Sequence, residues 1–140
     1  MSQSLTAHLV VPVANPDDAH ATARSLREYP HGEVTVVHVV EKAGGAPDKL
    51  SLEQAEMLAT ESFAAFREII PDVETELVYH EDVVEGIVDL AVAVDGSAIA
   101  FRPRGGSRLV QLLAGDRALK LVTKPDLPVI ALTDTDAEDS

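Results

Sequence analysis

The residues best suited to chemistry in this 140-residue chain are the arginines and glycines between positions 102 and 117. Glycine lets backbone N–H groups approach phosphate oxygens, and the planar guanidinium of arginine suits phosphate geometry. This segment carries four arginines against one aspartate, a net charge of +3, although the whole chain carries -13. The sequence therefore predicts a small-anion site, with these candidate residues: Arg102, Arg104, Gly105, Arg108, Gly115, Asp116 and Arg117.

Two interpretations of this segment stay open. In the first, the arginines bind phosphate. In the second, they pair with the many acidic side chains of the surface or with a second subunit. Asp116 also has a structural interpretation, because aspartate is a good N-cap and its carboxylate would compete with phosphate for the N–H donors of a helix N-terminus.

Known catalytic and metal-binding motifs do not occur in the sequence. It contains no P-loop, no dinucleotide fingerprint and no His-Glu-x-x-His motif, and without cysteine it has no thiol nucleophile. The best metal-ligand cluster is His80-Glu81-Asp82, but we expect Asp82 to cap a helix instead. His38 is expected to be a hydrogen-bonded, partly buried histidine of a strand. We therefore predict no catalytic residue and no metal site.

The 24 acidic residues outnumber the 11 basic ones, which disfavours nucleic acids and anionic membranes as partners. Only four residues are lysines, and acidic residues lie on every polar face, so a halophilic source is our hypothesis. The first nine residues do not resemble a signal peptide, and no apolar run approaches the roughly 20 residues that span a bilayer. We expect a cytoplasmic protein.

Short apolar runs alternate with segments of helical periodicity, which is typical of an α/β fold. Strands are predicted at residues 7–13, 33–40, 73–79, 97–101 and 128–132. Helices are predicted from Asn15 as N-cap to about residue 29, from the Ser51–Gln54 capping box to Pro71, from Asp82 to Val94 and from Asp116 to about residue 124. The acidic tail, residues 133–140, is expected to fray.

Each of the three longer helical segments has an apolar stripe that should face the sheet. The predicted stripes are Ala19, Thr22, Ala23 and Leu26; then Leu52, Ala55, Leu58, Ser62, Phe63, Phe66 and Ile69; then Val83, Ile87, Leu90, Ala91 and Val94. Repeated strand-helix-strand units imply right-handed crossovers and an open parallel sheet of five strands with helices on both faces. We expect a single domain over residues 1–140, with any ligand bound beyond the carboxyl ends of the strands.

The chain resembles the universal stress protein family. The resemblance covers nearly the whole sequence and includes Val10-Val11-Pro12-Val13, Val37-His38-Val39-Val40 and Leu127-Pro128-Val129-Ile130 as strands. The family's C-terminal signature of three glycines and a hydroxyl residue aligns with Arg102, Gly105, Gly115 and Asp116. The resemblance implies an adenine-nucleotide alpha-hydrolase-like fold with strand order 3-2-1-4-5.

The resemblance also implies a nucleotide site in which Val13, Ala14 and Val40 flank the adenine and ribose. Three positions depart from the family pattern: Ala14 replaces an aspartate, Arg102 replaces a glycine, and Asp116 replaces a hydroxyl residue. We therefore expect a non-catalytic stress-response protein with a degenerate nucleotide or anion site. The alternative is a regulatory switch that binds ATP or AMP; a small-molecule enzyme ranks third.

The last strand provides a candidate dimer interface. By the family order, it lies at an edge of the sheet, where an exposed apolar strand can pair with a second copy. Its residues are Val129, Ile130, Ala131 and Leu132. We expect a homodimer with twofold symmetry, which is the commonest arrangement, although the acidic tail could instead shield this edge.

Overall fold

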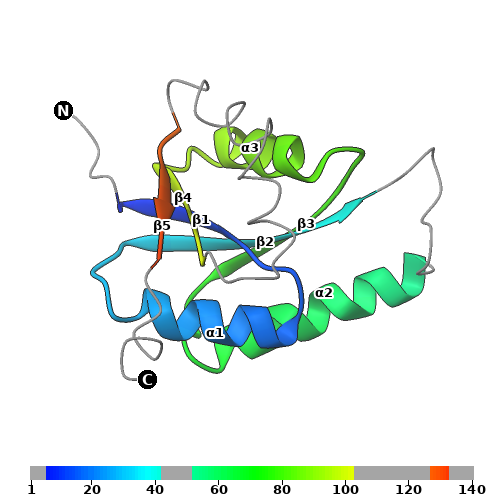
Figure 1. Ribbon diagram of the computed structural model, residues 1–140, viewed down its shortest axis with the longest axis horizontal. Coiled ribbons are helices and arrows are strands. Elements are labelled where there is room, and N and C mark those ends of the chain that lie inside the picture. The colour runs from blue at the N-terminus through cyan, green and yellow to red at the C-terminus, as the bar shows by residue number, and fades with distance from the viewer. Residues whose placement is uncertain (1–5, 42–51, 103–126, 133–140) are drawn as a thin grey trace.

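The computed structural model describes residues 6–41, 52–102 and 127–132. Its described strands form one parallel sheet in the order β3-β2-β1-β4-β5 (Figure 1). The strands are β1 (His8–Pro12), β2 (Glu33–Glu41), β3 (Glu74–His80), β4 (Ala98–Phe101) and β5 (Val129–Ala131). The predicted parallel sheet of five strands and its predicted order are confirmed.

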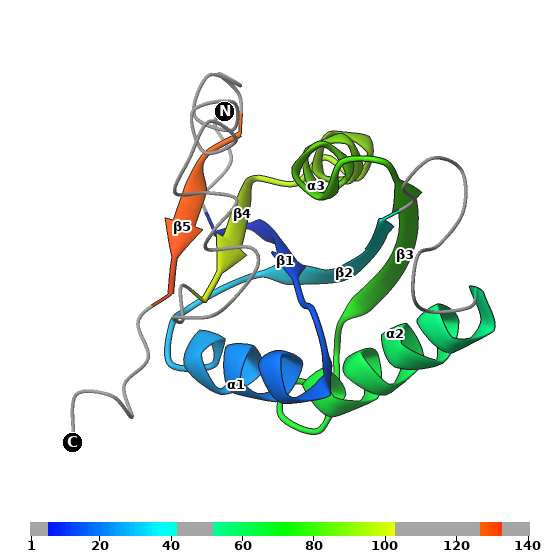
Figure 2. The ribbon, with the colours of Figure 1, turned by 45° about the vertical axis from the view of Figure 1, so that its right-hand side comes forward.

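Helices cover both faces of the sheet, as predicted. Helices α1 (Pro16–Leu26) and α2 (Leu52–Arg67) lie on one face, and α3 (Val83–Ala93) lies on the other (Figure 2). Two of the predicted N-caps are confirmed: the side chain of Asn15 accepts the N–H of Asp18, and that of Asp82 accepts the N–H of Glu85. Among the described residues, no helix has both the length and the apolarity needed to cross a membrane.

Two apolar cores form because the side chains of β1 alternate between the faces of the sheet. Leu9 and Val11 pack with Phe66 on the side of α1 and α2. Val10 packs with Ile87 on the side of α3. The central strand is thus buried on both faces, which explains why its sequence is continuously apolar.

The predicted stripe of α1 is confirmed, because all four of its residues are buried. On α2, Leu52 was predicted to face the core but is 51% exposed. On α3, Val84 and Val88 are buried, whereas Val83 and Leu90 are only partly buried, so the buried stripe is rotated from its predicted position.

Several predicted boundaries also shift. Helix α1 ends at Leu26, three residues before the predicted end. Helix α2 ends at Arg67, although the sequence predicts that it continues to Pro71. The described strand ends differ from the predicted ones by at most one residue. Ser51, the helix predicted from Asp116 and the acidic tail lie outside the described residues.

Candidate functional site

The sheet has its topological switch point between β1 and β4, because the chain continues from β1 to β2 on one side and reaches β4 on the other. In open parallel sheets, ligands bind beyond the carboxyl ends of the strands at such a point. Val13 and Ala14 follow β1 there, and Arg102 follows β4. The structure therefore places three of the predicted site residues on the two sides of the switch point.

Two hydrogen bonds with β2 hold the backbone directly after β1. The N–H of Val13 donates to the carbonyl of Val37 at 2.9 Å. Nδ1 of His38 lies 3.0 Å from the carbonyl oxygen of Val13, and because a carbonyl can only accept, this ring nitrogen carries the proton. His38 is thus the buried, hydrogen-bonded histidine that the sequence predicts.

Burial lowers the pKa of His38 below its ordinary value of 6.5, and the hydrogen bond to Val13 opposes this shift. The folded protein therefore binds a proton at His38 less readily than the unfolded chain does. The resulting stabilisation is fully present above pH 6.5 and is lost as the pH falls through the lower pKa of the folded state.

We expect His38→Asn to reduce the loss of stability between pH 7.5 and pH 5.5, because an amide can donate to Val13 but does not titrate. Urea denaturation of both proteins at the two pH values measures this difference. His31→Asn, which removes a less buried histidine, serves as the control and should keep the wild-type pH dependence. An unchanged pH dependence in His38→Asn would contradict the assignment.

The start of α1 brings a carboxylate to the switch point. Asn15 has extended backbone angles and caps the helix, and Asp18 occupies its first turn. Oδ2 of Asp18 accepts the backbone N–H of Ala14 at 2.8 Å, while its own N–H donates to Asn15. The two side chains thus cap the chain reciprocally, much as a capping box does.

Asp18 also reaches the strand on the far side of the switch point. Its Oδ1 lies 3.7 Å from Nη2 of Arg102. The Arg102 side chain is only 9% exposed and that of Asp18 20%, so the pair is largely shielded from solvent. No local sequence pattern indicates this contact with Arg102, because the Asn15–Asp18 spacing at the helix start predicts only the reciprocal cap.

The other predicted site residues lie partly inside and partly outside the described chain. Val40 is buried near the end of β2, and Ala14 is exposed. Arg104, Gly105, Arg108, Gly115, Asp116 and Arg117 lie outside the described residues. The described part of the site therefore consists of the ends of β1, β2 and β4 with the first turn of α1.

The ring nitrogens of His80 both face neighbouring groups. Nδ1 accepts the backbone N–H of Asp82 at 2.9 Å, and Nε2 lies 3.5 Å from Oδ2 of Asp89. Asp82 itself caps α3. Within the described ranges, no three histidine, aspartate or glutamate side chains form a group that could hold a metal ion.

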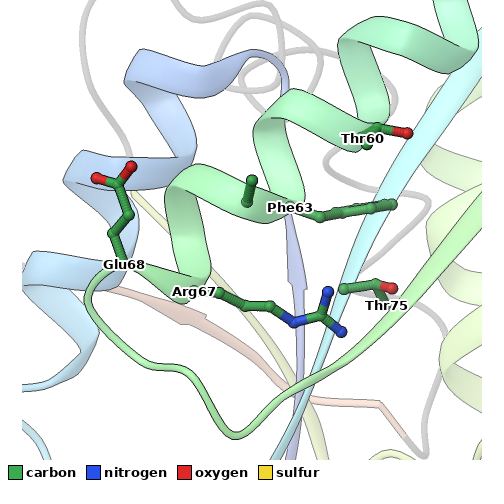
Figure 3. A pocket seen from close by; sticks show the side chains of 6 residues that line it. Thr60, Phe63, Arg67, Glu68 and Thr75 are labelled. Atoms are coloured by element: carbon green, nitrogen blue, oxygen red, sulfur yellow. The ribbon is translucent and has the colours of Figure 1, made fainter.

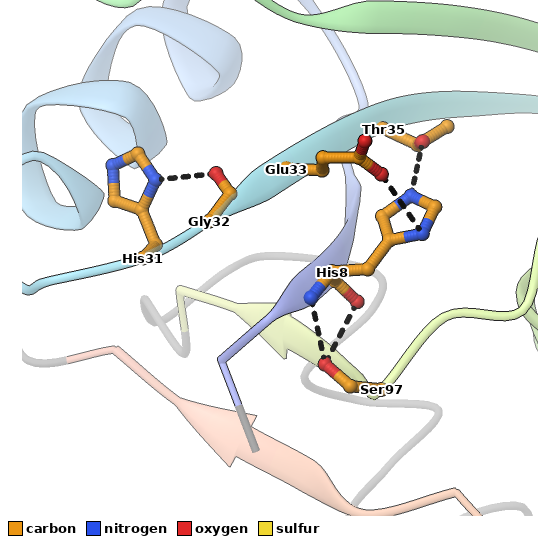
Figure 4. Close-up of polar contacts among 6 residues, drawn as sticks. All are labelled: His8, His31, Gly32, Glu33, Thr35 and Ser97. Carbon is orange, nitrogen blue, oxygen red and sulfur yellow. Dashed lines mark hydrogen bonds and ion pairs between the residues drawn. The ribbon is translucent and has the colours of Figure 1, made fainter. Parts of the chain in front are cut away.

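A polar network lies at the opposite, amino-terminal ends of the strands (Figure 4). The hydroxyl of Ser97 accepts the backbone N–H of His8 at 2.9 Å and donates to the His8 carbonyl at 3.0 Å. The His8 ring lies 2.8 Å from the hydroxyl of Thr35. Since the serine hydroxyl bonds the backbone of His8 rather than its ring, these contacts tie β1 to β4 and do not activate a nucleophile.

A shallow hollow of about 530 Å³ lies between α2 and the edge strand β3 (Figure 3). Its lining residues are Thr60, Phe63, Ala64, Arg67, Glu68 and Thr75. The guanidinium of Arg67 donates to the carbonyl of Val73 at 3.2 Å, which links α2 to the start of β3. This hollow does not coincide with the switch point.

The edge position predicted for the last strand is confirmed within the described sheet, where β5 pairs with β4 alone. Val129 and Ile130 are partly buried and Leu132 is buried. Ala131 belongs to the strand and pairs with Phe101 in the register.

Comparison with known proteins agrees with this topology. Residues 6–132 match the universal stress protein family, whereas no curated protein matches the sequence. A universal stress protein from Archaeoglobus fulgidus is 23% identical with a TM-score of 0.61, the match covering 90% of this chain and 93% of that one. A universal stress protein from the same organism, in complex with dAMP, is 21% identical with a TM-score of 0.60, over 93% and 100% of the two chains. Because the family match extends over most of the sequence, the chain belongs to the universal stress protein family.

Proposed function

We propose that this chain is a non-catalytic, homodimeric stress-response protein of the cytoplasm, built as one universal-stress-protein-like domain with a degenerate nucleotide or anion site. The observation that carries the proposal is that Ala14 stands just after β1 and that its N–H group is already bonded. Its methyl group supplies no acceptor for an adenine or ribose, and its N–H already donates to Asp18. Across the switch point, Arg102 stands where the family pattern has a glycine, and its guanidinium lies beside Asp18.

A second candidate is a regulatory switch that binds ATP or AMP. The observation in its favour is the dAMP complex of the Archaeoglobus fulgidus protein, whose fold is similar to that of this chain. In this alternative, Val13, Ala14 and Val40 flank the base and sugar, while Gly105, Gly115, Asp116 and Arg117 present backbone groups to the phosphates. A phosphate ion bound by the arginines that follow β4 is instead the anion form of the degenerate site.

The proposed dimer uses the edge strand β5. Edge strands expose backbone donors and acceptors that a second copy can pair with. The half-buried Val129 and Ile130 lie on the two faces of this edge and would become more buried in a twofold pair. Val129–Leu132 is therefore the proposed interface.

One preparation tests both parts of the proposal. Protein purified at high salt without added ligand should have twice the mass of the chain by light scattering and release no nucleotide on acid extraction. Titration with ATP should give a dissociation constant weaker than about 1 mM. Stoichiometric co-purified nucleotide would instead support the switch, and a monomer would contradict the proposed dimer.

Ile130→Lys should convert the dimer into a monomer, because it places a charge within the apolar edge. Thr75→Lys adds the same charge to β3 at the opposite edge and should leave the dimer intact. Circular dichroism of both variants separates loss of assembly from loss of folding.

A further inference from the structure

The carboxylate of Asp18 joins three elements that meet at the switch point. Oδ2 accepts the N–H of Ala14, directly after β1, at 2.8 Å. Oδ1 lies 3.5 Å from the hydroxyl of Thr22, one turn further along α1, and 3.7 Å from the guanidinium of Arg102, directly after β4. One side chain therefore bridges both sides of the site.

This arrangement places a negative charge beside the guanidinium that a phosphate group would bind. A guanidinium is a strong binding group for phosphate, but here a carboxylate of the same chain already neutralises it. A phosphate that approached Arg102 would also come close to Asp18, and like charges a few ångströms apart repel strongly when solvent is largely excluded. The exposed fractions of 9% for Arg102 and 20% for Asp18 indicate such shielding.

The helix start offers little compensation for this repulsion. Anions are normally stabilised at a helix N-terminus by free N–H groups and by the helix dipole. At α1, Asn15 accepts the N–H of Asp18, and Asp18 accepts the N–H of Ala14. The two side chains thus take up donors that an incoming anion would use.

We propose that Asp18 determines the ligand specificity of the switch point. Its carboxylate excludes phosphate-bearing small molecules because it already binds Arg102 and the N–H of Ala14. The inference rests on the proposed degenerate site and names the residue that makes it so. When the carboxylate charge is removed, Arg102 should bind the phosphate group of AMP and inorganic phosphate.

The test is calorimetric titration of AMP and inorganic phosphate at constant ionic strength. Asp18→Asn removes the charge but keeps an oxygen that can accept the N–H of Ala14, so affinity should rise roughly tenfold or more over the wild type. The matched control is Asp17→Asn, which makes the same change in net charge at the neighbouring exposed position and should bind as weakly as the wild type. Adding Arg102→Gln to Asp18→Asn should abolish the gain.

Asp18→Ser provides a second variant if the asparagine variant folds poorly, and it also opens space beside Arg102. Melting curves establish that each variant is folded before titration. An equal gain in Asp17→Asn and Asp18→Asn, or a gain that survives Arg102→Gln, would overturn the role of Asp18. Weak binding by the wild type and by both Asp18 variants would overturn only this inference, whereas tight binding by the wild type would overturn the degenerate site as well.

Discussion

Phe66→Ala is expected to lower the free energy of unfolding by about 3–5 kcal/mol, the usual cost of emptying a fully buried phenylalanine site. Phe66 has no exposed surface and packs from α2 against the core formed with α1 and β1. Its removal leaves a cavity that the neighbouring valines can fill only in part. Since a domain of this size is stable by only about 5–15 kcal/mol, the variant should be close to unfolding at moderate urea concentrations.

Phe63→Ala is the matched control for this change. Phe63 lies on the same helix but is only partly buried and lines the hollow beside β3. The same loss of atoms should therefore cost clearly less there. Urea denaturation followed by circular dichroism measures both variants, and equal losses would contradict the assignment of Phe66 to the centre of this core.

Gly32→Ala should have the second large effect, with a loss of about 3 kcal/mol through overpacking. A Cβ atom at position 32 would lie 3.1 Å from the carbonyl carbon of Ala7 and closer still to its oxygen. The chain cannot move away without cost, because the N–H of Gly32 donates to Thr6 and that of Glu33 donates to Ala7, both at 2.8 Å. These bonds align the start of β2 with that of β1.

Gly86→Ala is the corresponding control. Gly86 lies inside α3, and a Cβ atom there would meet side-chain atoms at 3.1 Å and beyond. The better helix propensity of alanine, worth up to about 1 kcal/mol, offsets part of that crowding. Thermal unfolding of the two variants should thus give a much larger loss for Gly32→Ala, and similar melting temperatures would contradict the crowding argument.

The local rules of the sequence predicted most of the fold. The apolar run around Val10 predicted a strand buried on both faces, and Asn15 and Asp82 predicted two helix starts that the structure confirms. These predictions succeed because a strand or an N-cap depends on residues within a few positions of each other. Leu52 shows the limit: helical periodicity assigned it to the buried face, but burial requires a neighbouring element, and at this end of α2 it is 51% exposed.

Sequence patterns predicted only part of the candidate site. The local excess of arginine pointed to Arg102, and the family resemblance pointed to the end of the first strand, but neither assigned Asp18 a role at the site. Its contact with Arg102 joins residues far apart in the chain, and nothing in either local sequence indicates it. The bond from His38 to Val13 is likewise a contact between neighbouring strands.

By itself, then, the sequence determined the order of strands and helices, the apolar faces and the concentration of acidic charge, because periodicity and composition act over short stretches of chain. The tertiary structure decided which polar groups meet at the switch point. Parallel pairing sets β1 beside β4, and only that pairing brings the carboxylate of Asp18 to the guanidinium of Arg102. The partners of a side chain follow from the packing of elements that are distant in sequence, which no local pattern encodes.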